Sequence, residues 1–295
     1  MFAKINMKTQ TGLETRLVTM RLVMKRRRRR VQMPLAMRLE KRNASEEEEK
    51  GKGGIYLWLL DRDGVINEDV GSPGVIDVDR FKFLPLVKES LWSIRRRQNV
   101  DESPTSKTNA AVRKVVCLIT NQTCVGKEII TEAYLTDVIH KRMTEELSRD
   151  GGADAFFDAI LYETSPVEGN NRRKPAPGMV LEALQMFPPN TPGKDGVIFV
   201  GDSMTDMMAA GRAEIESGRS ITRVLVGTGY GSRVWSELRV AEEYEEELVD
   251  DGVFYYYVES ERNDVNKESS LDAFPEECFP LYVAKDLAAA VDIFL

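Results

Sequence analysis

The chain has 295 residues, enough for one large α/β domain or two smaller ones with a buried core. Its 42% hydrophobic and 30% charged residues are typical of a soluble globular protein, and no run of about 18 apolar residues predicts a membrane helix or a membrane partner. Three cysteines without CxxC spacing argue against a disulfide framework, so we expect an intracellular protein, cytoplasmic by default.

The net charge of −7 conceals two regions of opposite sign. Residues 1–43 carry 13 Lys or Arg against two acids, whereas the remaining 252 residues carry 28 basic and 46 acidic side chains. We interpret residues 1–54 as a basic, disordered leader or tail with a charged linker. The acid-poor, Arg-rich composition is also compatible with an organellar presequence, and the run from Lys25 to Arg30 with a nuclear signal or a nucleic-acid contact. A start codon placed too early is a further alternative, since methionines recur between Met7 and Met37.

From residue 55 onward, short apolar runs alternate with amphipathic stretches. Apolar runs typical of buried strands occupy 55–60, 115–119, 159–162, 197–200 and 222–226. Helical periodicity occupies 86–97, 131–149, 178–187 and 204–216. A last strand at 281–285 and a helix at 286–294 close the domain. This alternation predicts βαβ units and a mostly parallel α/β sheet.

Two stretches interrupt this pattern. Residues 98–112 are polar, and we interpret them as a surface insertion. Residues 235–277 hold 15 acids against three basic residues around the apolar island 253–258. We expect an acidic excursion that carries a hairpin, with a binding flap as the alternative.

Polar side chains follow the predicted strands at the edge of the sheet where open parallel sheets bind ligands. They are Asp61 and Asp63 after the first strand, Thr120 and Asn121 after the second, Asp202 and Asp206 after the fourth, and Lys174 ahead of the helix at 178–187. Each element alone could be a solvated loop, a helix cap or a turn. Four such elements in this order indicate one site.

These residue types suit phosphoryl transfer. Asp61 can attack phosphorus to give an aspartyl-phosphate, and Asp63 can protonate the leaving oxygen and then deprotonate water. Three acids on neighbouring loops repel a phosphate unless a hard cation lies between them, which predicts Mg²⁺. Thr120 and Asn121 can donate to phosphoryl oxygens, and Lys174 can offset negative charge.

The chain resembles the haloacid-dehalogenase superfamily, whose four motifs match Asp61/Asp63, Thr120, Lys174 and Asp202/Asp206. Four segments are also similar to the branch of the heptose 1,7-bisphosphate phosphatases and the histidinol-phosphatase domain: DRDGVIN at 61–67, TNQ at 120–122, RKPAPGM at 173–179 and GTGYG at 227–231. The likeness covers residues 55–295, apart from the two insertions.

The resemblance implies a Rossmann-like sheet with helices on both faces and little or no cap domain. It implies Mg²⁺-dependent hydrolysis of a small sugar phosphate or bisphosphate, or of histidinol phosphate, with Asp61 as nucleophile and Asp63 as acid and base. Mg²⁺ would be held by Asp61, Asp202 and the backbone carbonyl of Asp63.

The resemblance also assigns the phosphate contacts. Thr120, Asn121 and Lys174 would hold the transferring phosphate, and Arg173 would contact the substrate. Asp206 would support the site by orienting Lys174 rather than by binding metal.

The sequence departs from this branch in the loop at 163–173, where many members bind a structural zinc. This loop has neither Cys nor His, so we expect no zinc. The segment 123–127 also differs from the branch and contains Cys124, which we interpret as a packing residue. His140, the single histidine, falls within a predicted helix, and we expect a surface or packing role.

Two other functions remain open. A nucleic-acid 3′-phosphatase of the polynucleotide-kinase type shares the TNQ and RKP motifs, and the basic tail would suit a polyanion. Against it, Arg62 and the VIN segment at 65–67 fit the sugar-phosphate branch better, and the core is acidic. A catalytically idle fold used as a binding module is disfavoured because every catalytic position is filled.

Overall fold

The structure is a computed structural model that describes residues 55–96, 113–149, 156–167, 169–189, 196–243, 253–256 and 270–295. The leader expected at 1–54 and the insertion expected at 98–112 both lie outside these residues. None of the described helices combines the length and apolar composition that crossing a membrane requires.

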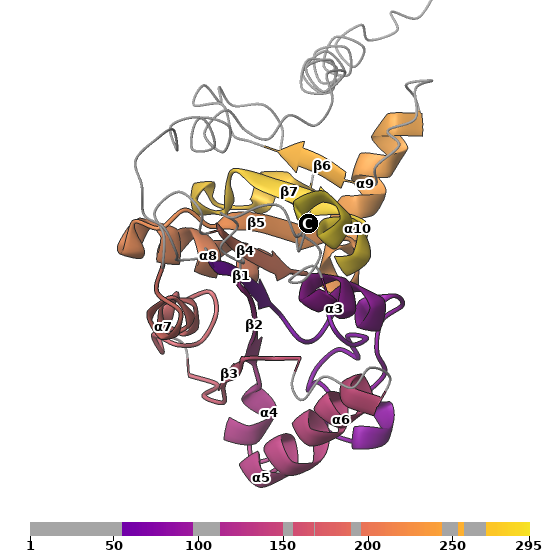
Figure 1. Cartoon of the computed structure of the whole chain (residues 1–295), viewed down its shortest axis with the longest axis vertical. Coiled ribbons are helices and arrows are strands. Elements are labelled where there is room, and N and C mark those ends of the chain that lie inside the picture. Colours follow the sequence, from indigo (N-terminus) through magenta and orange to yellow (C-terminus); the bar gives the residue numbers. More distant parts are fainter. Residues whose placement is uncertain are drawn as a thin grey trace, which may run out of the picture. The chain divides into compact units, whose positions relative to one another are not determined.

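A seven-stranded sheet organises the described residues (Figure 1). In spatial order its strands are β3 (Ala159–Glu163), β2 (Arg113–Asn121), β1 (Ile55–Leu60), β4 (Gly196–Gly201), β5 (Thr222–Val226), β7 (Leu281–Ala284) and β6 (Val253–Tyr256). All neighbouring pairs are parallel except β6 and β7, which are antiparallel. The prediction of a mostly parallel sheet is confirmed.

Strand β1 forms the centre of the sheet. Its residues Leu57 to Leu60 are fully buried, and Leu60 lies opposite Leu118 of β2 and Val200 of β4. Because successive side chains point to opposite faces, Trp58 and Leu60 pack into one hydrophobic cluster and Leu57 and Leu59 into another. A strand buried on both faces therefore ends at the edge of the sheet, where Asp61 follows.

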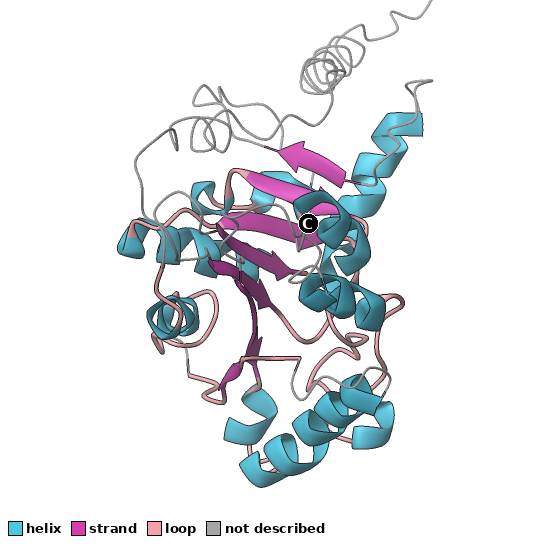
Figure 2. Cartoon of the chain, in the orientation of Figure 1, coloured by secondary structure: helices cyan, strands magenta, loops and turns pink. Residues whose placement is uncertain are grey.

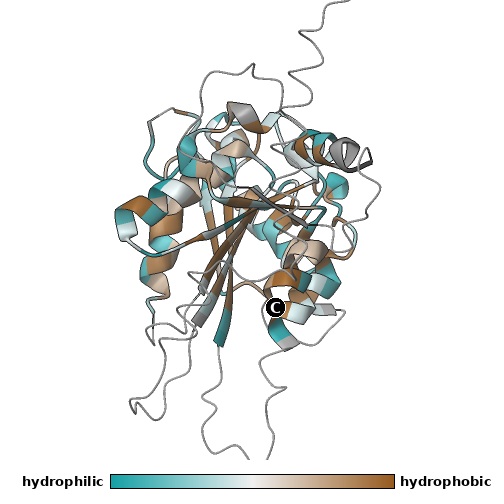
Figure 3. Cartoon of the chain, turned by 90° about the horizontal axis from the view of Figure 1, so that it is seen from above, coloured by the Kyte–Doolittle hydropathy of each residue, from teal (hydrophilic) through white to brown (hydrophobic). Residues whose placement is uncertain are grey.

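Helices cover both faces of this sheet, as predicted (Figure 2). On one face, α3 (Val87–Arg96), α6 (Lys141–Arg149) and α10 (Leu287–Phe294) contribute to the cluster around Trp58. On the other face, α7 (Gly178–Met186) and α8 (Met204–Ser217) contribute to the cluster around Leu57. Figure 3 shows the hydrophobic strands between the two helical layers.

Two expectations need correction. The stretch expected as one helix at 131–149 consists of α5 (Glu132–Tyr134), the π-helix η3 (Leu135–His140) and α6 in direct succession. The apolar island expected to form a hairpin within the acidic excursion instead supplies β6, whose partner β7 lies beyond that excursion. Helix α9 (Ser232–Glu243) also runs across the expected start at residue 235. Pairing partners distant in the sequence leave little trace in local composition.

Candidate active site

The carboxyl ends of the central strands open into a cavity of about 590 Å³. Seven of the eight predicted site residues line it: Asp61, Asp63, Thr120, Asn121, Lys174, Asp202 and Asp206. Asp61 directly follows β1, Asn121 ends β2, and Asp202 directly follows β4. Each buried apolar run stops there because the next side chains face the cavity. The structure therefore brings together residues that are up to 145 positions apart.

Lys174 lies at the centre of this group and is only 3% exposed. Its Nζ is 2.7 Å from Asp61 Oδ1 and 2.6 Å from Asp206 Oδ1, and it donates to the Ile119 carbonyl oxygen at 2.8 Å. Burial alone would lower the pKa of Lys174, but the two carboxylates outweigh it and raise the pKa above its ordinary value. Lys174 therefore stays cationic, held by two ion pairs and one hydrogen bond.

The carboxyl groups of Asp61, Asp202 and Asp206 lie within 4.8 Å of one another. Burial raises the pKa of Asp61 to about 7, with the attraction of Lys174 opposing it and the repulsion of Asp206 adding to it. Burial, followed by repulsion from Asp206 and Asp61, raises the pKa of Asp202 to about 9. The cluster thus holds more negative charge than Lys174 neutralises, and a hard cation with oxygen ligands fits it.

Both carboxylate oxygens of Asp206 contact other protein groups. Its Oδ1 contacts Lys174, and its Oδ2 accepts from the Ser203 backbone N–H at 3.0 Å and the Ser203 hydroxyl at 2.6 Å. The bond from the Ser203 backbone N–H is half of the capping box that begins α8. Of the three carboxylates, Asp61 and Asp202 are therefore the better placed to accept a cation.

The Asp202 carboxylate packs closely against two glycines, Gly64 and Gly229. Its Oδ2 accepts from the Tyr230 backbone N–H at 2.9 Å. A Cβ at Gly64 or at Gly229 would overlap the Asp202 carboxylate, and both glycines have positive φ angles of 81° and 54°. Both positions therefore require glycine.

Asp63 is held as a carboxylate by three neighbouring side chains. Arg62 Nη2 donates at 2.9 and 3.1 Å, Asn67 Nδ2 at 2.8 Å and Gln122 Nε2 at 3.0 Å. Burial alone would raise the pKa of Asp63, but the Arg62 guanidinium and these hydrogen bonds hold it below its usual value. In this state Asp63 can accept a proton.

Behind Asp63 lies a buried pair that sequence reasoning did not identify. Arg62 is fully buried, and its Nη1 lies 3.3 Å from Nε2 of His140 in η3. Burial and the Arg62 charge lower the pKa of His140 to about 3, so the imidazole is neutral and accepts this bond. His140 is thus buried against the site, 78 residues from its partner. Nothing near either residue in the sequence signals the contact.

The loop after β2 contributes one more residue that was missed. Gln122 Nε2 donates both to Asp63 and, at 2.9 Å, to Thr120 Oγ1. Because Thr120 Oγ1 accepts from Gln122, its own hydroxyl hydrogen is available to another acceptor. Asn121 pairs with the Lys174 backbone, donating to its carbonyl at 2.9 Å and accepting from its N–H at 3.1 Å.

Arg173 is the predicted site residue that the structure does not bring to the cavity wall. Its Nη1 donates to the Pro166 carbonyl oxygen at 2.8 Å, and Arg173 is not among the residues that line the cavity. Its contact with substrate stays a prediction.

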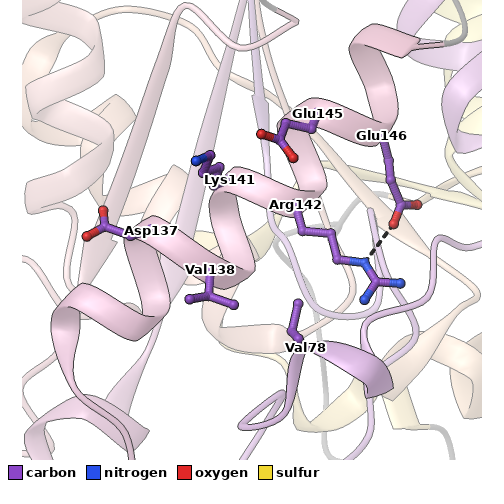
Figure 4. A pocket seen from close by; sticks show the side chains of 7 residues that line it. All are labelled: Val78, Asp137, Val138, Lys141, Arg142, Glu145 and Glu146. Atoms are coloured by element: carbon purple, nitrogen blue, oxygen red, sulfur yellow. Dashed lines mark hydrogen bonds and ion pairs between the residues drawn. The ribbon is translucent and has the colours of Figure 1, made fainter.

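A second cavity, of about 470 Å³, is built differently (Figure 4). Charged side chains from η3 and α6 line it together with Val78 and Val138: Asp137, Lys141, Arg142, Glu145 and Glu146. Arg142 pairs with Glu146 at 2.8 Å and with Asp79 at 3.2 Å, and its side chain is 41% exposed. These charges are solvated and partly neutralise one another, so they do not form a catalytic group.

Comparison with known proteins agrees with this geometry. A family model described as HAD-hydrolase-like matches residues 171–251. The chain is 29% identical over 179 residues to the D-glycero-alpha-D-manno-heptose-1,7-bisphosphate 7-phosphatase of Mycobacterium bovis, covering 61% of this chain and 84% of that protein. It is 32% identical over 160 residues to the beta-anomer 7-phosphatase of Bordetella bronchiseptica, covering 54% and 76%.

A solved structure is similar as well. The D,D-heptose 1,7-bisphosphate phosphatase of B. bronchiseptica, complexed with magnesium and phosphate, superposes with a TM-score of 0.53 at 25% identity. The match covers 81% of this chain and 97% of that one.

Proposed function

Because this chain belongs to the haloacid-dehalogenase-like hydrolases and is a phosphatase of the branch that contains the heptose-1,7-bisphosphate 7-phosphatases, we propose that it is a Mg²⁺-dependent phosphomonoesterase acting on a small sugar bisphosphate. One observation carries the proposal. The Asp61 carboxylate stands at the end of β1, 2.7 Å from Lys174 and within 4.8 Å of the Asp202 carboxylate. A nucleophile, a fixed cation and a second metal-binding carboxylate thus face one cavity.

In the first step, a carboxylate oxygen of Asp61 attacks phosphorus and the bond to the sugar oxygen breaks. Asp63 gives its proton to that oxygen, and the sugar leaves as an alcohol. Asp63 acquires this proton when substrate enters, because a nearby phosphate anion raises the pKa of a carboxyl group. The product of the step is an aspartyl-phosphate on Asp61.

In the second step, Asp63 removes a proton from water as the water oxygen attacks the aspartyl-phosphate. The bond between the Asp61 oxygen and phosphorus breaks and inorganic phosphate leaves. Asp61 is again a free carboxylate, and Asp63 carries the proton from water, as it carried one at the start of the first step. Arg62, Asn67 and Gln122 fix Asp63 in place through both steps. Their hydrogen bonds also favour the carboxylate form that this step needs.

Mg²⁺ would be held by Asp61, Asp202 and the backbone carbonyl of Asp63, and when bound it supplies positive charge for the transferring phosphoryl group. Thr120 donates its free hydroxyl hydrogen to a phosphoryl oxygen. Lys174 offsets the negative charge that develops there, and Asn121 holds the Lys174 backbone in register. Asp206 fixes the Lys174 ammonium, and Arg173 contacts the sugar portion.

The substrate class follows from the relatives and from size. The named relatives are heptose-1,7-bisphosphate 7-phosphatases, and a cavity of about 590 Å³ is of the size that binds small molecules. The test is phosphate release with Mg²⁺ from heptose 1,7-bisphosphate, other sugar phosphates, histidinol phosphate and a 3′-phosphorylated oligonucleotide. We expect the sugar bisphosphate to give the highest kcat/KM and EDTA to abolish turnover.

Two results would overturn the proposal. Undiminished turnover in EDTA would exclude the metal-dependent mechanism. A clear preference for the oligonucleotide, lost on removal of residues 1–54, would favour the nucleic-acid 3′-phosphatase that the basic run at 25–30 suits.

A further inference from the structure

The cavity extends well beyond the catalytic carboxylates. The rest of its lining, called the outer wall below, comes from three segments: the loop 69–74, the stretch from η4 (Gly229–Gly231) into the start of α9, and η5 (Ser270–Ala273) with the residue that follows it. The outer-wall residues that matter below are Asp69, Tyr230, Arg233, Ser270 and Phe274. A bound phosphoryl group at Asp61 would fill only the inner part of this space.

The charges on this wall are unequal. Five carboxylates line the cavity: Asp61, Asp63, Asp69, Asp202 and Asp206. Among the described residues that line it, the basic side chains are those of Lys174 and Arg233. Lys174 already contacts Asp61, Asp206 and the Ile119 carbonyl oxygen. Arg233 is therefore the cation of the described wall that remains for a second negative group of the substrate.

Arg233 is oriented from one side only. Its Nε donates to Glu237 Oε1 at 3.0 Å, one helical turn along α9, and no contact of its Nη1 or Nη2 with another described residue accompanies this bond. Its side chain is 79% exposed. The outer edge of the guanidinium is thus available to a ligand, and a guanidinium matches two phosphate oxygens at once.

Glu237 is itself fixed by Ser270 of the neighbouring η5, a residue that also lines the cavity. Its Oε2 accepts from the Ser270 backbone N–H at 2.8 Å, and its Oε1 accepts from the Ser270 hydroxyl at 2.8 Å. Arg233, Glu237 and Ser270 form a chain of hydrogen bonds that joins α9 to η5, and its two outer members, Arg233 and Ser270, line the cavity. This arrangement restricts the Arg233 side chain before substrate arrives, which lowers the entropy cost of binding.

We propose that Arg233 determines substrate specificity by binding the second, non-transferred phosphoryl group of a sugar bisphosphate. The inference rests on the proposed function. The inner phosphoryl group is served by Lys174 and the metal, whereas the outer one would face Asp69 and the rest of a net negative wall without a cation of its own. Arg233 supplies that cation from the first turn of α9.

The test compares the kinetics of Arg233→Ala with those of wild type on two substrates. One is the sugar bisphosphate, and the other is the monophosphate that keeps only the scissile phosphoryl group. We expect the KM for the bisphosphate to rise about 10- to 100-fold, since a charge-assisted contact is lost, with kcat changed less than about threefold. The kcat/KM for the monophosphate should change far less, so the preference for the bisphosphate collapses. Arg233→Lys should restore part of the preference, because it keeps the charge and loses the fork.

A matched control is Arg142→Ala. Arg142 has the same pairing with a glutamate four residues on, but it lines the second cavity. It should leave the KM for both substrates unchanged, which separates a local effect from loss of a surface ion pair.

Two outcomes overturn the inference. An Arg233→Ala enzyme that keeps the wild-type preference shows that the second group binds elsewhere. Equal losses of kcat on both substrates show that Arg233 acts through the catalytic centre or the fold. If wild type releases phosphate from no substrate in the panel, the proposed function itself fails and this inference fails with it; active wild type with an unchanged preference in the variant defeats the inference alone.

Discussion

Both cavities are lined by charged side chains, but they differ in what surrounds those charges. In the catalytic cavity, Asp61, Lys174 and Asp202 are 8%, 3% and 3% exposed. In the second cavity, the side chain of Arg142 is 41% exposed, and that of its partner Asp79 is 84% exposed. Water screens the second set, whereas the first set interacts through protein, where the same separation gives a much larger energy. Burial therefore distinguishes a reactive cluster from a solvated one.

The two cavities also differ in how the chain builds them. The residues of the second come almost entirely from η3 and α6, with Val78 from η2 (Val78–Arg80). Those of the catalytic cavity come from the ends of β1, β2 and β4 and from loops far apart in the sequence. Backbone hydrogen bonds within the sheet fix these ends relative to one another, so substitution at one end should act on residues delivered by others. The following experiments test this contrast, in order of decreasing effect.

Asp61→Asn should have the largest effect. The amide keeps the shape of the side chain but cannot attack phosphorus, so kcat should fall on the order of 10³-fold or more. The variant should be at least as stable as wild type, because it removes one of three mutually repelling acids. The matched change Asp137→Asn in the second cavity should leave kcat unaltered. Substantial Mg²⁺-dependent turnover by Asp61→Asn, free of contaminating phosphatase, would falsify the assignment of the nucleophile.

Asp63→Asn should have a smaller effect that depends on the leaving group. Attack by Asp61 remains possible, but the leaving oxygen is no longer protonated, so sugar phosphates should lose roughly 10²-fold or more in kcat. Aryl phosphates leave readily without a proton and should lose markedly less in the first step. Rates measured over a series of leaving-group pKa values should give a steeper dependence than wild type. Equal losses across the series would argue against Asp63 as the acid.

Gln122→Ala should reduce kcat by about tenfold, because two neighbours lose a hydrogen bond. The informative measurement is the pH–rate profile. Gln122 stabilises the Asp63 carboxylate, so its removal should raise the pKa of Asp63. The part of the pH–rate profile that reports the titration of Asp63 should then move to higher pH. A loss of rate without any shift of the profile would mean that Gln122 serves only the fold.

The smallest expected effect is on stability. Burial raises the folded-state pKa of Asp61 and of Asp202 above the usual 3.8, to about 7 and about 9, so the folded state binds more protons than the unfolded state across this range. The metal-free protein should therefore lose stability as the pH rises from about 4 toward 9. Added Mg²⁺ should restore Tm at pH 8 more than at pH 5, since cation and protons compete for the same carboxylates. Asp61→Asn should flatten the dependence, and Arg142→Ala should not. Thermal unfolding with and without EDTA measures both.

Local pattern was sufficient for the sheet and for the residues at its strand ends. A buried apolar run that stops at an acid, as at Asp61, marks both the strand and its functional end, because no strand can bury an unpaired charge at low cost. The same reasoning located Thr120 and Asp202, and the expected fold class is confirmed.

What remained hidden depends on contacts between distant segments. The Arg62–His140 pair joins residues 78 positions apart, and β6 finds its partner only beyond the acidic excursion. Arg233 lies in the first turn of a charged helix, and an arginine in such a position normally indicates a solvated surface. Only the placement of α9 beside the cavity gives it another meaning. Arg173 is the reverse case, since its motif predicts a substrate contact while its guanidinium is bonded to Pro166.

The burial and pairing of Lys174 have a consequence for chemical labelling. An amine reacts with acylating reagents only as the free base and only where the reagent can reach it. Lys174 is buried, its pKa is raised, and its ammonium group pairs with Asp61 and Asp206 and donates to the Ile119 carbonyl oxygen. Lysine-directed reagents should therefore modify the exposed Lys141 and leave Lys174 intact in the folded protein. Covalent inhibitors that target lysine would therefore not react with Lys174 at this site.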